Sequence, residues 1–186
     1  MITSRDIEVK EFLKEFKIAD TTIISKLFFP SLSACQKRLK IMHDKKVVKR
    51  DRDFITREYI YYLKRPNQLK HAMLVSRFYA EMKKTLNIQT FKIEPKLGEI
   101  RPDALFGYEE NGIKKIGLLE VEISNKGFNY YKYKQFLSNE EYKKYFPIVP
   151  RIHIVTNKKI NQNEIKTKSI LYDEKINKEI AVENIN

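Results

Sequence analysis

The chain has 186 residues and a mass of 22.3 kDa. This length fits one large domain or two small ones and excludes a multidomain machine. Its 37 Lys and Arg against 24 Asp and Glu give a formal net charge of +13, and 42% of its residues are hydrophobic. That combination excludes a disordered basic tail and predicts a folded body that binds a polyanion.

Cysteine usage and hydropathy bear on the cellular compartment. The single cysteine, Cys35, excludes an internal disulfide, and with only 3 His the chain has no Cys-rich zinc site. No stretch approaches the length of about 18 uncharged apolar residues that a membrane span needs. The first sixteen residues carry Asp and Glu where a signal peptide would be apolar. We therefore expect a soluble, cytoplasmic protein with no membrane contact.

The positive charge is concentrated in one part of the chain. Residues 36–65 carry 11 Lys or Arg against 4 Asp or Glu, a local charge of +7, whereas residues 66–186 together carry +6. A polar, proline-containing segment at residues 64–68 follows the basic stretch and indicates a domain boundary. We therefore predict two domains, residues 1–65 and residues 68–186, with the polyanion contact in the first.

Three short helices are expected at the start of the first domain. Ser4 or Asp6 is expected to cap the first helix, Thr21 or Thr22 to begin the second, and Ser31 or Ser33 to precede the third. The third helix would bury a stripe at i, i+4 and i+7 made of Cys35, Leu39 and Met42. Residues 47–48 and 59–63, joined by a charged loop, predict a two-stranded hairpin.

This order of elements is the layout of a winged helix-turn-helix. The stretch from Ser33 to Val48 resembles the recognition helix and first wing strand of winged-helix regulators, in which a helix reads base edges and the hairpin neutralises phosphates. Those regulators usually have Gly where this chain has Lys46, because the helix ends there in a left-handed residue. The resemblance implies double-stranded DNA as the partner. We assign Gln36, Lys37 and Lys40 to the groove-facing side of the helix and Lys45, Lys49, Arg50, Arg52 and Arg57 to phosphates, and we include Ser33 in the DNA-binding set.

The second domain has the pattern of a mixed sheet with helices. A helix over residues 68–86 is followed by strands near 89–93, 103–108 and 115–123, of which the last two flank the strong hairpin signal Asn111-Gly112. A helix near 128–145, a buried strand at 152–155 and a weaker terminal helix-plus-strand region complete the chain. The predicted fold is α+β, with the element order α-β-β-β-α-β in the second domain.

Three carboxylates are expected to converge on that sheet. Alternate residues of a strand share a face, so Glu120 and Glu122 point the same way and Asp103 can meet them from the neighbouring strand. Such a cluster repels itself unless a divalent cation sits in it. Pro102-Asp103 followed by Glu120-Val121-Glu122 resembles the PD-(D/E)XK nuclease fold. The resemblance implies Mg²⁺ held by Asp103 and Glu120, and a catalytic set Asp103, Glu120 and Glu122, with Glu122 at the family's lysine position.

A further resemblance covers nearly the whole chain. A winged helix followed by His71, Arg101-Pro102-Asp103, Leu119-Glu120-Val121-Glu122 and the Tyr- and Lys-rich stretch 126–133 is similar to the plasmid replication-relaxation proteins. Their Glu-x-Asp is Glu-Val-Glu here. The resemblance implies an association with the DNA of a bacterial plasmid, phage or integrative element, and with replication or conjugation proteins.

Several functions remain open at this point. The favoured hypothesis is a DNA-binding accessory or regulatory protein, as a homodimer, whose nuclease-like domain no longer cleaves. The alternative is a Mg²⁺-dependent endonuclease that uses Asp103, Glu120 and Glu122. A third hypothesis is a protein-docking adaptor, since winged helices also serve that purpose. The structural alternative to all three is that the basic helix face is merely solvated and the carboxylates pair with lysines.

Overall fold

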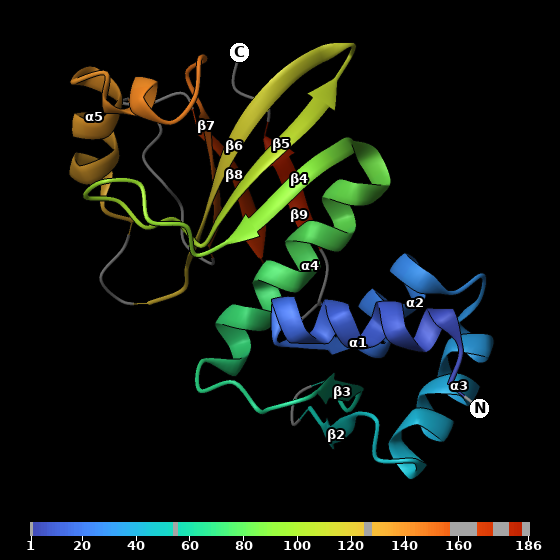
Figure 1. Cartoon of the computed structure of the whole chain (residues 1–186). Coiled ribbons are helices and arrows are strands. Elements are labelled where there is room, and N and C mark those ends of the chain that lie inside the picture. Colours follow the sequence, from blue (N-terminus) through green and yellow to red (C-terminus); the bar gives the residue numbers. More distant parts are fainter. Residues whose placement is uncertain (1, 54–55, 125–127, 157–166, 173–178, 184–186) are drawn as a thin grey trace. The chain divides into compact units, whose positions relative to one another are not determined.

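The computed structural model describes residues 2–53, 56–124, 128–156, 167–172 and 179–183 of a mixed α+β chain (Figure 1). The chain divides into two compact units, which we call unit 1 (Met1–Lys84) and unit 2 (Thr85–Asn186). This division falls later than the boundary predicted at residues 64–68, because α4 (Leu69–Thr85) packs with the first unit. Ser76 Oγ on α4 donates to the carbonyl of Ile18 at 2.5 Å. None of the described helices is both long and apolar enough to cross a membrane.

The first three helices of unit 1 begin at side-chain caps. α1 (Ser4–Phe16) is capped by Thr3, whose hydroxyl accepts from Asp6 N while the Asp6 carboxylate accepts from Thr3 N at 2.9 Å. The predicted cap at Ser4 or Asp6 was therefore wrong, because this reciprocal pair starts the helix one residue earlier. Asp20 caps α2 (Thr21–Phe28) through a single hydrogen bond, in which its Oδ1 accepts from Ile23 N at 2.7 Å. α3 (Leu32–Asp44) is capped by Ser31, as predicted.

The end of α3 has the conformation that the sequence predicts. Cys35, Leu39 and Met42 are buried, which confirms the predicted stripe. Lys46 has φ 59°, in the left-handed region, and Val47 N then donates to Met42 O at 2.9 Å. A side chain with a Cβ is strained there.

Replacing Lys46 with glycine relieves this strain. We expect Lys46→Gly to raise the free energy of unfolding by about 1 kcal/mol, because glycine adopts a positive φ without steric cost. Thermal unfolding followed by far-UV circular dichroism measures the change. As a control, Asp44→Gly, at the last helical residue of α3, is expected to lower stability by up to about 1 kcal/mol. A destabilised Lys46→Gly protein would contradict the assignment of strain to this residue.

A small sheet completes unit 1. β2 (Lys49–Arg52) and β3 (Tyr59–Tyr62) pair antiparallel, and β1 (Ile18–Asp20) pairs with the other edge of β3. The first hairpin strand was predicted at residues 47–48, but those residues lie in the turn that closes α3, so the strand begins at Lys49. β1 was not predicted. Ile60 and Tyr62 point to one face, where they pack with Ile18 and Ala72.

Unit 2 is built on a six-stranded sheet with the order β4-β5-β6-β7-β8-β9. The β5–β6 hairpin turns at Asn111 and Gly112, both with positive φ, which confirms the predicted hairpin. β6 pairs parallel with β7, and β7 parallel with β8, while the other pairs are antiparallel. The strands are β4 (Asn87–Ile93), β5 (Ala104–Glu110), β6 (Ile113–Glu122), β7 (Arg151–Thr156), β8 (Thr167–Tyr172) and β9 (Glu179–Glu183).

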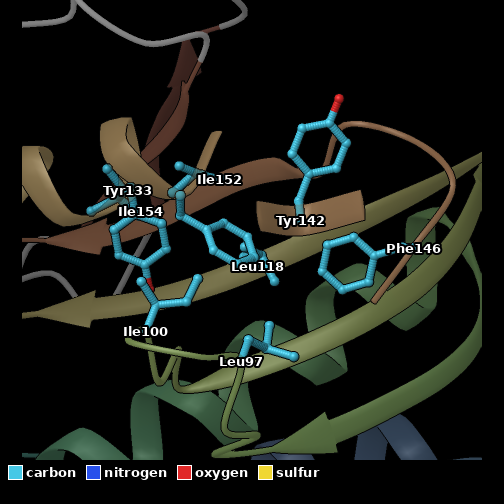
Figure 2. Packing of buried hydrophobic residues seen from close by; sticks show 9 residues of the cluster. Leu97, Ile100, Leu118, Tyr133, Tyr142, Phe146, Ile152 and Ile154 are labelled. Atoms are coloured by element: carbon cyan, nitrogen blue, oxygen red, sulfur yellow. The ribbon is translucent and has the colours of Figure 1, made fainter. Parts of the chain in front are cut away.

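The connection from β6 to β7 covers one face of this sheet. The helix predicted over residues 128–145 is broken into α5 (Tyr130–Ser138) and a 3₁₀ helix, η1 (Glu141–Lys144), because Glu140 between them has a left-handed φ of 56°. Strand and helix side chains interlock in one buried cluster (Figure 2). Its members are Leu97, Ile100, Leu118, Tyr133, Phe136, Tyr142, Phe146, Ile152 and Ile154.

The other face of the sheet contains a close approach of backbone and ring. Phe106 pairs across the strands with Gly117, and a Cβ added to Gly117 would lie 2.2 Å from Phe106 Cζ. Phe106 is fully buried and stacks on Phe91 at a centroid distance of 5.6 Å. The ring therefore has little space into which to move.

A methyl group at Gly117 should overpack this face. We expect Gly117→Ala to lower the free energy of unfolding of unit 2 by about 2 kcal/mol. Urea denaturation followed by circular dichroism measures the loss. The double variant Phe106→Leu with Gly117→Ala should lose less unfolding free energy than the sum of the losses in the two single variants, because the leucine side chain leaves room for the new methyl group. Strict additivity would contradict the proposed clash.

Candidate functional site

A hollow of about 600 Å³ lies in unit 1 between α3, the β2–β3 hairpin and the start of α2. We call it the α3–hairpin hollow. α3 contributes Leu32, Gln36 and Lys40 because these three exposed residues follow one another at a spacing of four along the side of the helix next to the buried stripe. Its lining is Thr21, Thr22, Leu32, Gln36, Lys40, Arg50, Arg57, Glu58, Tyr59 and Tyr61.

The hairpin presents aromatic rings and guanidinium groups to this hollow. Tyr59 and Tyr61 share one face of β3, since alternate residues of a strand point the same way. The guanidinium carbon of Arg50 lies 4.4 Å from the centre of the Tyr59 ring, and that of Arg52 lies 4.8 Å from it. Arg52 Nη2 also donates to the Tyr59 hydroxyl at 3.3 Å and thereby lowers the pKa of this phenol. The ring therefore holds two cations in place.

One carboxylate lines the same hollow. Glu58 is half-buried, and its Oε1 accepts a hydrogen bond from Thr22 Oγ1 at 3.3 Å. Burial raises the pKa of Glu58, and the negative charge of Asp20 raises it further. The loop before it is held by Asp53, which accepts from Thr56 N at 2.7 Å, and Arg57 adopts a left-handed φ of 61° there.

The structure brings together part of the residue set predicted from the sequence. Gln36, Lys40, Arg50 and Arg57 all line the hollow, and Arg52 packs on its Tyr59. Four other predicted residues are exposed but do not line it: Ser33, Lys37, Lys45 and Lys49.

Sequence reasoning missed the uncharged part of the lining and its acid. The missed residues are Thr21, Thr22, Leu32, Glu58, Tyr59 and Tyr61. Strand alternation would have placed Tyr59 and Tyr61 on one face, but the start of α2 comes from a distant part of the chain and left no local signal.

Arg38 on α3 points away from this surface. Its Nε donates to Asp6 Oδ1 at 2.7 Å, and its Nη2 also pairs with the Asp6 carboxylate. Asp6 is only 2% exposed, so this ion pair holds α3 against the start of α1. The Arg38 guanidinium lowers the pKa of Asp6 to about 2. This arginine therefore has a structural partner.

The carboxylates of unit 2 lie at the ends of β5 and β6. Asp103 N donates to Leu119 O at 2.8 Å, and Val121 N donates to Asp103 Oδ2 at 2.7 Å, so the Asp103 side chain continues the strand pairing. Glu120 accepts a hydrogen bond from the Tyr133 hydroxyl of α5. Burial raises the pKa of Tyr133, and the nearby carboxylates of Glu120 and Asp103 raise it further.

The third predicted carboxylate has other partners. Glu122 Oε1 accepts from Ser124 N at 2.7 Å and from Ser124 Oγ at 2.5 Å, in a tight turn at the end of β6. Across the residues that the structure describes, no group of three or more His, Cys, Asp or Glu side chains is placed to hold a metal ion. Of the three predicted carboxylates, Asp103 and Glu120 both act on Tyr133, whereas Glu122 is engaged by Ser124 in this turn.

Comparison of the chain with protein-family models, with curated proteins and with solved structures finds no match.

Proposed function

We propose that unit 1 binds double-stranded DNA through the α3–hairpin hollow, in the manner of a winged helix-turn-helix. The observation that supports this proposal is the convergence of Lys40, Arg50 and Arg57 from two separate elements on one hollow. In this arrangement Gln36 is available to base edges from an exposed helix face, and the guanidinium groups neutralise phosphates beside it. The concentration of charge in residues 36–65 adds to the attraction.

Fluorescence anisotropy of a labelled duplex tests this function. We expect the association constant K to fall with increasing salt, with a slope of about −3 in a plot of log K against log salt concentration, since the three cations that line the hollow would each neutralise one phosphate. Absence of binding at about 50 mM salt would favour the docking-adaptor hypothesis, because non-specific binding of DNA is strongest at low salt.

The biological role that we propose is accessory or regulatory, at an origin or operator of a bacterial mobile element. Its support is the resemblance of the landmarks from His71 to Tyr133 to the plasmid replication-relaxation proteins. One winged helix reads only a few base pairs, so a homodimer on a two-fold site would double the contact. Replication or conjugation proteins are the protein partners that this role implies.

The second candidate function is Mg²⁺-dependent DNA cleavage in a PD-(D/E)XK-like unit 2. Its support is the pair of carboxylates, Asp103 and Glu120, that both act on the Tyr133 hydroxyl. Mg²⁺ is often held by one or two carboxylates together with substrate phosphates, so these two side chains fit as its ligands. The ion would supply Lewis-acid activation of water. Glu122 is engaged with Ser124 and leaves the catalytic set incomplete.

One agarose gel separates the two candidate functions. We expect supercoiled plasmid incubated with the protein in Mg²⁺, in Mn²⁺ or in EDTA to be retarded but intact in every lane. Asp103→Ala should give the same retardation, because it leaves unit 1 unchanged. Nicked or linear plasmid that requires the metal and disappears with Asp103→Ala would establish the endonuclease instead.

A further inference from the structure

The α3–hairpin hollow contains an acid that a phosphate-binding surface does not need. Among the described residues that line it, Glu58 is the acidic one, and it shares the hollow with Lys40, Arg50 and Arg57. Its carboxylate is held by the Thr22 hydroxyl at the start of α2. A DNA phosphate drawn into the hollow by these cations would therefore approach a carboxylate as well.

Charged groups on several elements act on Glu58. Burial has the largest effect and raises its pKa, and the carboxylates of Asp20, the cap of α2, and Asp53, after β2, raise it too. The Thr22 hydrogen bond and the positive charge of Arg77 on α4 lower it. Arg77 is itself bound to Asp20 at 2.7 Å, which offsets part of its effect. The balance leaves Glu58 easier to protonate than an exposed glutamate.

We infer that duplex DNA binds to the form of the α3–hairpin hollow in which Glu58 is protonated, so that binding takes up a proton. This inference rests on the proposed DNA-binding function and adds its regulation by pH. A phosphate is a like charge to the carboxylate, and a like charge at short range in a partly desolvated site favours the neutral acid. The pKa of Glu58 is therefore higher in the complex than in the free protein. The affinity for DNA therefore rises as the pH falls through the pKa that Glu58 has in the complex, and it levels off below the pKa that Glu58 has in the free protein.

The test measures the dissociation constant of one labelled duplex between pH 5 and pH 8 at constant ionic strength, for the wild type and for Glu58→Gln. Glutamine has the shape of the protonated acid, and its carbonyl still accepts from Thr22. At pH 8 we expect Glu58→Gln to bind about tenfold more tightly than the wild type, and the difference to shrink towards pH 5. The titration of groups common to both proteins cancels in this ratio.

Two further variants keep the interpretation specific. Glu11→Gln removes the same charge from an exposed ion pair with Lys14 on α1 and should change affinity less than about twofold at physiological salt. Thr22→Val removes the hydrogen bond that favours the carboxylate, so the rise in affinity should begin at a higher pH. Thermal unfolding of each variant shows whether it is folded.

The outcomes are distinct. A constant ratio of affinities between wild type and Glu58→Gln across the pH range would overturn the inference while leaving DNA binding intact. Weaker binding by folded Glu58→Gln at every pH would also overturn it. That result would instead indicate that the ionised carboxylate accepts a hydrogen bond from the amino group of a base. Absence of binding by both proteins at low salt and at every pH would overturn the proposed function itself.

Discussion

Reversing the charge of Lys40 and Arg57 together is expected to lower the affinity for duplex DNA by at least about a hundredfold and to reduce the salt slope by about 2. Both side chains are exposed and both line the α3–hairpin hollow, one from α3 and the other from the hairpin loop. In the proposed complex, each reversal would remove one phosphate contact and add a repulsive charge in its place. Anisotropy titrations at several salt concentrations measure both quantities.

The matched control reverses Lys10 and Lys114, which are exposed and lie outside the hollow. Both double variants carry the same net charge, so a general electrostatic attraction would weaken equally in the two proteins. We expect the affinity of the control variant for duplex DNA to fall by less than about fivefold at physiological salt. Equal losses of affinity in the two double variants would show that the hollow is not the DNA-binding surface.

The Asp6–Arg38 ion pair is expected to make the largest single electrostatic contribution to the stability of unit 1. Arg38 donates a hydrogen bond to each of the two Asp6 carboxylate oxygens, and Thr3 N donates to the carboxylate as well. We expect Asp6→Asn to lower the free energy of unfolding at neutral pH by about 2 to 3 kcal/mol, since Asn leaves a partly buried guanidinium without its counter-charge. Urea denaturation followed by circular dichroism measures this loss.

The same pair predicts a defined pH dependence. The pKa of Asp6 is lowered from 3.8 to about 2 in the folded protein. Because the pKa is lower in the folded state, the ionised Asp6 stabilises the fold at any pH above its unfolded-state pKa. This stabilisation is lost as the pH falls towards its folded-state pKa. The wild type should therefore lose about 2 kcal/mol between about pH 4 and pH 2 that Asp6→Asn does not lose.

Glu11→Gln provides the control for this prediction as well. The Glu11–Lys14 pair lies on the same helix, with the Glu11 side chain 60% exposed, and breaking it should cost less than about 0.5 kcal/mol. Parallel pH profiles for the wild type and Asp6→Asn between pH 2 and pH 4 would show that Arg38 does not act on this carboxylate.

The fold was predictable from sequence wherever a local pattern specified it. The stripe Cys35, Leu39 and Met42 recurs at helical spacing, and Asn111-Gly112 fixes a two-residue turn, so α3 and the β5–β6 hairpin followed directly. β1 consists of only three residues, too few to show an alternating pattern, and depends on pairing with β3 across the sequence. Local propensity contains no information on such a partner.

The candidate sites were predictable to the extent that residues on one element determine them. Helix and strand spacing placed Gln36 and Lys40 on an exposed face, and the β5–β6 pairing placed Asp103 near Glu120. Two features of the sites were not predicted, because they depend on contacts that form only in the folded protein. Thr22 reaches Glu58 from a distant segment, and Glu122 turns to a hydroxyl two residues later.

The parallel pairing of β6 with β7 bears on how the protein folds. These strands meet only after the chain has passed through residues 123–150, which include α5 and η1. Closing such a long connection is entropically costly before any strand contact rewards it, and parallel sheets therefore form slowly. Unit 1 is complete at Lys84, so during synthesis it has emerged before the first strand of the larger sheet. Its helices and hairpin are then free to fold while unit 2 is still being made.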